Sequence, residues 1–207
     1  MRDSDVRSAV RKMLDERHAG DLNTRIVEEM GIWSGSVRID IAVINGELCG
    51  FELKSDRDTL QRLPLQSQLY SHVFDRVDLV VGERHAKKAE KQIPEWWGLQ
   101  VASLAENGVH LHEGRRGKFN PTPTPYLIAQ LLWKSEAIHV LEERGLAKGW
   151  KSKRIKAIHK RIAAELPLNE LRDEVRAALK SRSSDWLGQV RAGELDMPVE
   201  SNSDPVF

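Results

Sequence analysis

The sequence predicts an α/β fold, in which a mixed central sheet flanked by helices is followed by a small all-α C-terminal subdomain. Short β-branched segments alternate with helical ones over the first part of the chain. A proline-rich stretch then interrupts the pattern, and only helical periodicity follows it. A chain of 207 residues has room for one core domain and a small second one. We therefore expect a core over residues 1–119, a linker over 120–126, a helical subdomain over 127–190 and a disordered polar tail over 191–207.

The composition is typical of a globular protein of a reducing compartment. Hydrophobic residues make up 40% of the chain and charged residues 30%. No run approaches the roughly 18 apolar residues of a membrane span, and the N-terminal residues lack the apolar stretch of a signal peptide. Cys49 is the only cysteine, which excludes a disulfide framework and fits the cytoplasm. We expect a cytoplasmic protein without a membrane partner, and we assign no oligomeric state.

Two helices are expected before the first strand. Val6, Val10 and Leu14 recur at helical spacing and predict an amphipathic helix over residues 4–17. Apolar residues between positions 21 and 30 predict a second, short helix, which Gly31 would end as a C-cap residue.

A hairpin gives the strongest strand signal. Residues 37–44 are rich in β-branched side chains and lead into an Asn-Gly dipeptide, which is typical of hairpin turns. Residues 48–54 would form the return strand. The same patterns then predict helices over 63–74 and 83–93, and strands over 77–81, 99–104 and 109–112.

The C-terminal part is expected to be helical throughout. Prolines at alternate positions favour an extended linker over residues 120–126. Beyond it, we expect helices over 127–144, over 152–166 with Ser152 as the N-cap, and over 169–181.

The hairpin carries charged side chains where strands are usually apolar. Asp40 lies between two isoleucines, and Glu52 and Lys54 share one face of the return strand because strand side chains alternate. Such charges are costly unless they are paired or bind a metal. One interpretation is a structural ion pair. The other is a metal centre, in which two carboxylates hold Mg²⁺ or Mn²⁺ and the lysine assists the attack of water on a phosphodiester.

Three further polar residues would support such a centre. Gln66 and Tyr70 are four residues apart, so they share one helix face and would position the site or contact a phosphate backbone. On the expected helix over 21–30, Glu29 falls closer to the apolar stripe than Glu28 and is the better candidate for a third carboxylate. A solvated helix face is the alternative for all of them.

The hairpin register decides whether the two carboxylates meet. A plain two-residue Asn-Gly turn would put Asp40 and Glu52 on opposite faces of the sheet. A shared site needs one extra residue. We therefore predict a bulge or a three-residue loop between Ile44 and Phe51, permitted by a glycine with positive φ.

The order of these motifs resembles the PD-(D/E)XK, restriction-endonuclease-like nucleases. A strand with Asp, a hairpin, a strand with Glu-x-Lys and a helix with Gln-x-x-x-Tyr follow one another over about residues 20–115. More narrowly, segments 38–46, 50–56, 79–82 and 94–99 are similar to a bacterial and phage family of uncharacterised function within that superfamily. One departure is that Arg38, rather than Pro, precedes Asp40 by two positions. The resemblance implies a restriction-endonuclease-like sheet.

A basic segment follows the linker. Lysines and arginines gather between positions 148 and 161, where they would attract phosphates, and the two helices around them would resemble a helix-turn-helix. A solvated helical surface balanced by nearby acidic residues is the alternative. The expected nucleic-acid-binding residues are Lys151, Lys153, Arg154, Lys156, Lys160 and Arg161.

We interpret the sequence as that of a metal-dependent deoxyribonuclease acting in DNA repair, phage or defence-related processing. Asp40, Glu52 and the backbone carbonyl of Leu53 would bind Mg²⁺ or Mn²⁺, and Lys54 would assist the attacking water. One alternative is a catalytically inactive DNA-binding or adaptor module of the same fold. Another is a transcription-type regulator that acts through its helical C-terminal part.

Overall fold

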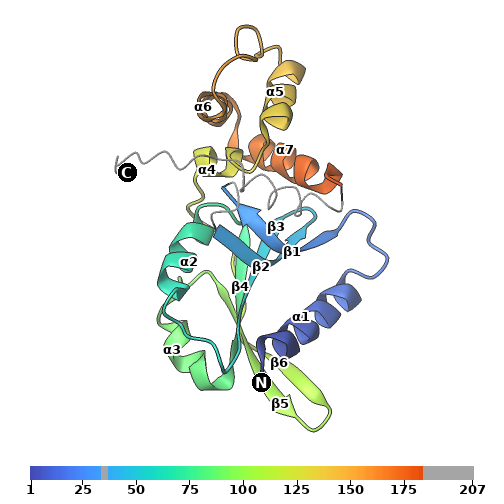
Figure 1. Ribbon diagram of the computed structural model, residues 1–207, viewed down its shortest axis with the longest axis vertical. Helices are drawn as coiled ribbons and strands as arrows, with labels where there is room; N and C mark the ends of the chain where they lie inside the picture. The colour runs from blue at the N-terminus through green and yellow to red at the C-terminus, as the bar shows by residue number, and fades with distance from the viewer. Residues whose placement is uncertain (34–36, 184–207) are drawn as a thin grey trace, which may run out of the picture.

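The computed structural model describes residues 1–33 and 37–183 and is an α/β structure built on a mixed sheet (Figure 1). The sheet has six strands in the order β1-β2-β3-β4-β5-β6. Strands β1 to β3 are antiparallel, β3 to β5 are parallel, and β6 returns antiparallel to β5. The strands are β1 (Arg25–Ile32), β2 (Val37–Ile44), β3 (Leu48–Lys54), β4 (Arg76–Gly82), β5 (Gly98–Ala105) and β6 (Gly108–Arg115).

Helices cover both faces of this sheet. Helix α1 (Asp3–Arg17) packs Val6, Val10 and Leu14 against apolar residues of the central strands. The other face carries α2 (Leu63–Ser71), the 3₁₀ turn η1 (Glu83–His85) and α3 (Ala86–Glu90) (Figure 1). Cover on both faces explains why β3 and β4 are apolar along most of their length, and why charged residues within them stand out.

The C-terminal helices sit at one end of the sheet (Figure 1). They are α4 (Pro125–Ala129), α5 (Lys134–Glu143), α6 (Ile155–Glu165) and α7 (Leu168–Ser181). Their apolar residues belong to the same buried cluster as those of the sheet. In addition, the guanidinium of Arg25 on β1 donates to the carbonyl oxygens of Leu179 and Lys180 at the end of α7. The sheet and the helices therefore share one continuous core, while the domain boundaries stay a prediction.

The expected helix over residues 21–30 is wrong. Asp21 instead organises a turn by accepting hydrogen bonds from the backbone of Asn23 and the hydroxyl of Thr24, and Leu22 is fully exposed. The chain then runs as strand β1, which pairs with β2 along its length. Short apolar runs fit both helix and strand, and pairing with a neighbouring strand decided the outcome here.

The other elements differ from expectation mainly at their ends. The helix expected over 127–144 is two helices, because the chain breaks after α4 and restarts where the Glu136 carboxylate accepts the N–H of Trp133 at 2.7 Å. Ser152 is not an N-cap, since α6 begins at Ile155 with Arg154 in that position. Helix α2 ends at Ser71, and the helix expected over 83–93 is the turn η1 followed by the short α3.

Two further expectations concern the polar tail and membrane-spanning helices. The polar tail over residues 191–207 lies outside the described residues. Within 1–33 and 37–183, no helix is both long and apolar enough to cross a membrane.

Candidate active site

The hairpin between β2 and β3 has the three-residue loop that the register argument predicted. Ile44 pairs with Leu48, which leaves residues 45–47 as the loop. The side chain of Asn45 closes it by accepting the N–H of Glu47 at 3.0 Å. Neither Gly46 nor Gly50 has a positive φ, so the loop does not use the left-handed glycine that we expected to permit it. This register, continued one step past Ile41–Phe51, sets Asp40 opposite Glu52.

The two strands part at the site. The hydrogen-bonded pairing of β2 with β3 ends at Ile41–Phe51, although both strands continue. Beyond that point, side chains form the hydrogen bonds that a neighbouring strand would otherwise make. Asp40 Oδ2 accepts the N–H of Leu53 at 2.8 Å, and the Tyr70 hydroxyl donates to the carbonyl of Arg38 at 2.6 Å. Buried backbone groups need such partners. The carboxylate of Asp40 is thereby held in the gap between the strands.

Glu52 is enclosed by hydrogen-bonding side chains. It is 1% exposed. Its Oε1 contacts the Lys54 ammonium and accepts the Gln66 amide at 2.6 Å, while its Oε2 lies 3.0 Å from the Tyr70 hydroxyl. The expected grouping of Glu52, Lys54, Gln66 and Tyr70 is therefore present.

The environment makes this carboxylate easier to protonate than an ordinary glutamate. Burial, together with the charge of Asp40, raises the pKa of Glu52 to about 7, against the opposing effect of Lys54. Burial also raises the pKa of Asp40, opposed by the N–H of Leu53 and by Lys54. The Tyr70 hydroxyl has one proton, and its shorter contact is with the carbonyl of Arg38.

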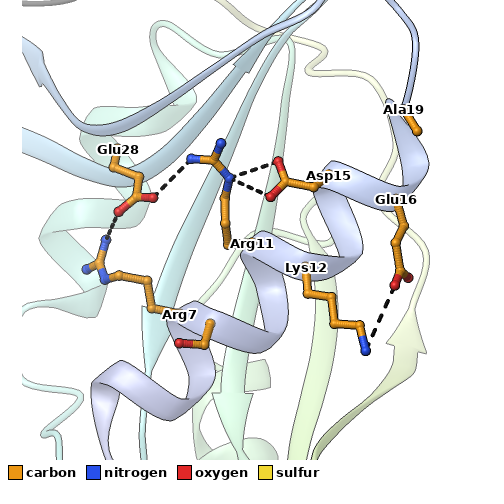
Figure 2. Close-up of a pocket in the computed structure, with 8 residues that line it drawn as sticks. Arg7, Arg11, Lys12, Asp15, Glu16, Ala19 and Glu28 are labelled. Carbon is orange, nitrogen blue, oxygen red and sulfur yellow. Dashed lines mark hydrogen bonds and ion pairs between the residues drawn. The ribbon is translucent and has the colours of Figure 1, made fainter.

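Helix α1 contributes an arginine that sequence reasoning missed. The Arg7 guanidinium donates to Asp40 Oδ1 at 3.1 Å and to the Asp40 carbonyl at 3.2 Å, and it forms an ion pair with Glu29 at 3.0 Å. Figure 2 shows Arg7 and Arg11 both reaching from α1 toward Glu28. Their spacing of four residues, beside the apolar stripe of α1, was the signal in the sequence.

Glu29 lies near the site for a reason other than the one predicted. It stands on a strand, not a helix, and has a left-handed φ of 53°. Pairing between β1 and β2 passes from Glu28–Ile41 to Met30–Ile39 and skips Glu29 and Asp40. Val27 and Met30 consequently enter the same core although they are three residues apart. Glu29 faces Arg7 and Arg38, so Arg7 stands between it and Asp40.

The donor atoms fit a hard divalent cation. Among the described residues, no group of three or more His, Cys, Asp or Glu side chains is placed to hold a metal. Mg²⁺ commonly needs only one or two carboxylates, with water and phosphate completing its shell. In a strand, the carbonyl and the N–H of one residue point to the same side. Because the Leu53 N–H donates to Asp40, the Leu53 carbonyl also faces the gap that holds Asp40. Gln66 Oε1 is buried there without a hydrogen-bond partner. Asp40, Glu52 and Leu53 thus supply a suitable oxygen set.

The basic segment is exposed as expected. Lys151, Lys153, Arg154, Lys156 and Lys160 are all exposed, and Arg161 is half-buried. Lys151 pairs with Glu142, and Arg161 pairs with Glu165 and stacks on Trp150. No ion pair to another described residue engages Lys153, Arg154 or Lys156. A positive surface therefore extends along the start of α6.

Comparison with known proteins places the whole of this architecture in one family. The family model for bacteriophage P4 protein cII matches residues 1–196. Protein cII of Enterobacteria phage P4 is 25% identical over 173 residues, which cover 82% of this chain and 65% of the phage protein. The chain therefore spans just under two thirds of that relative's length. No solved structure matches it. Because the family model covers the sheet, the candidate site and the C-terminal helices, the chain belongs to the bacteriophage P4 protein cII family.

Proposed function

We propose that this protein is a metal-dependent deoxyribonuclease with a restriction-endonuclease-like core. The observation that carries the proposal is that Asp40 stands opposite Glu52 where strands β2 and β3 part, with Lys54 in contact with Glu52. Buried charges converge at functional sites more often than elsewhere, because folding alone gains little from them. Cys49, a half-buried and unpaired cysteine, fits a reducing, cytoplasmic location for the activity, and desolvation raises the pKa of its thiol to about 12.

Each side chain has a role in phosphodiester hydrolysis. Asp40, Glu52 and the Leu53 carbonyl would hold Mg²⁺ or Mn²⁺, which supplies a Lewis acid for the phosphate and lowers the pKa of a bound water. The Lys54 ammonium orients the attacking water and offsets the negative charge that develops on the phosphate. Gln66 and Tyr70 fix the Glu52 carboxylate. Water adds to phosphorus as the bond to the leaving oxygen breaks.

The direct test is cleavage of DNA by purified protein with Mg²⁺ or Mn²⁺, on single-stranded, duplex and branched substrates. Asp40→Asn and Glu52→Gln keep the shape of the side chains and are expected to reduce cleavage by about 100-fold or more. Glu106→Gln is the control, because Glu106 is an exposed glutamate in the turn between β5 and β6. Cleavage that survives both site variants, or that no form of the protein performs, would refute the proposal.

The same geometry also supports a second candidate, a catalytically inactive DNA-binding or adaptor module. Both carboxylates already have a cationic partner within the chain, Arg7 for Asp40 and Lys54 for Glu52. A protein of this kind would bind DNA equally well with or without Asp40→Asn, and no form would cleave it.

DNA binding itself is expected to depend on the basic surface at the start of α6. The double change Lys153→Glu and Lys156→Glu should weaken duplex binding and reduce the slope of log K against log salt by about one for each lysine that contacts a phosphate. Fluorescence anisotropy at several salt concentrations measures both. Lys12→Glu is the control, since Lys12 is an exposed lysine on α1. An unchanged slope would place the DNA elsewhere.

A further inference from the structure

Arg7 binds the candidate metal centre from outside the sheet. Its guanidinium contacts Asp40 twice and Glu29 once, and it lies 4.0 Å from Glu28. The side chains of Arg7 and Asp40 are each 22% exposed, so water screens the charges of this pair less than those of a surface pair. No other described arginine or lysine forms an ion pair with Asp40.

This contact puts a positive charge beside the carboxylate that a metal ion would bind. Of the two Asp40 oxygens, Oδ2 accepts the Leu53 N–H and Oδ1 accepts Arg7. A divalent cation at Asp40 would lie next to the guanidinium, and two like charges in a half-buried position repel strongly. Metal binding and the Arg7–Asp40 pair are therefore in competition.

The structure also provides a second place for the guanidinium. Glu28 and Glu29 lie beside Arg7 on β1, and the left-handed φ of Glu29 turns its side chain toward the arginine. Such a backbone conformation is unfavourable for a residue with a side chain, and it persists where surrounding contacts compensate for it. Figure 2 shows that Arg7 already points toward Glu28.

We propose that Arg7 is a positioning residue of this site, which holds the Asp40 carboxylate until a divalent cation displaces the guanidinium onto Glu28 and Glu29. The inference rests on the proposed function in one respect, that a metal binds at Asp40. In this role Arg7, a residue of α1 that is not itself a ligand, sets the affinity of the site for the metal.

The test is Mn²⁺ binding to the full chain without DNA, measured by isothermal titration calorimetry. Arg7→Gln is expected to bind Mn²⁺ about tenfold more tightly than the natural protein, within the usual range of coupling between two ligands of one site. A purely structural role predicts the opposite sign, because a disordered Asp40 would bind the metal less well. Arg17→Gln is the control, since Arg17 lies on the same helix and its guanidinium contacts the sulfur of Met13, away from Asp40, Glu28 and Glu29.

Further variants keep the test decisive. Arg7→Met retains the apolar stem without the charge and replaces Arg7→Gln if that variant does not fold. Adding Glu29→Gln to Arg7→Gln should leave the tighter binding unchanged, whereas a Glu29 that is itself a metal ligand would weaken it.

The outcomes separate the two proposals. Equal or weaker Mn²⁺ binding by the Arg7 variants overturns this inference and leaves the nuclease proposal standing. Tighter Mn²⁺ binding by those variants, with no DNA cleavage by the natural protein, supports the inference and contradicts the nuclease proposal. If neither form binds Mn²⁺, both fail.

Discussion

Replacement of Lys54 with methionine is expected to reduce DNA cleavage by about 100-fold to 1,000-fold, also at a pH where Glu52 is ionised and can bind a divalent metal. Lys54 is 6% exposed and its ammonium contacts Glu52, so it stands where a water attacking the phosphate would be oriented. Methionine keeps a long apolar chain in this buried position and removes only the charge. The candidate ligands Asp40, Glu52 and Leu53 are all retained.

The pH dependence of cleavage distinguishes a catalytic role of Lys54 from a role in balancing the charge of Glu52. Without Lys54, the pKa of Glu52 should rise above its already elevated value of about 7, because Lys54 opposes the effects of burial and of Asp40. If the defect were only a protonated Glu52, raising the pH toward about 9 would restore cleavage, since carboxylates ionise above their pKa. We expect no such rescue. Lys12→Met is the control for loss of a lysine, and a Lys54→Met protein that cleaves DNA normally would show that Lys54 is a counter-ion only.

The centre of the site was predictable because local rules determine it. Strand alternation put Glu52 and Lys54 on one face, and the i, i+4 rule put Gln66 and Tyr70 on one face of α2. The conflict between a two-residue turn and a shared site forced the prediction of an extra loop residue, which the pairing of Ile44 with Leu48 confirms. Each step needed only the spacing of residues within a hairpin or one helix turn.

The margin of the site was not predictable in this way, because contacts between distant segments determine it. Residues 25–32 form a strand since β2 offers them a partner, and no local signal separates this outcome from a short helix. The left-handed Glu29 inverts the alternation of β1, which a regular pattern cannot reveal. Arg7 reaches Asp40 only because α1 packs over this end of the sheet, 33 residues away in sequence. The missed features therefore all belong to one tertiary contact between α1, β1 and β2.

Replacement of Asp75 with alanine is expected to lower the free energy of unfolding by about 3–5 kcal/mol, the usual cost of removing one partner of a buried ion pair. The Asp75 side chain is 2% exposed and lies between the sheet and helix α7. Its Oδ2 accepts the N–H of Leu48 at 2.8 Å and Arg176 at 3.2 Å, and its Oδ1 forms an ion pair with Arg172 at 2.7 Å. Alanine would leave the guanidinium of Arg172 and the N–H of Leu48 without this acceptor, and would leave Arg176 with only the exposed Asp173.

Asp173→Ala provides a closely matched control for this prediction, measured by urea unfolding. Asp173 is an aspartate that pairs with the same Arg176, but its side chain is 70% exposed. An exposed pair of this kind contributes at most about 1 kcal/mol, so the two variants should differ several-fold in their effect. Because the sheet and the C-terminal helices share one apolar core, the Asp75 variant should still unfold in a single transition, at lower urea. Equal losses for the two variants would mean that Asp75 does not anchor α7. A separate early transition would mean that the C-terminal helices unfold independently of the sheet that carries the candidate site.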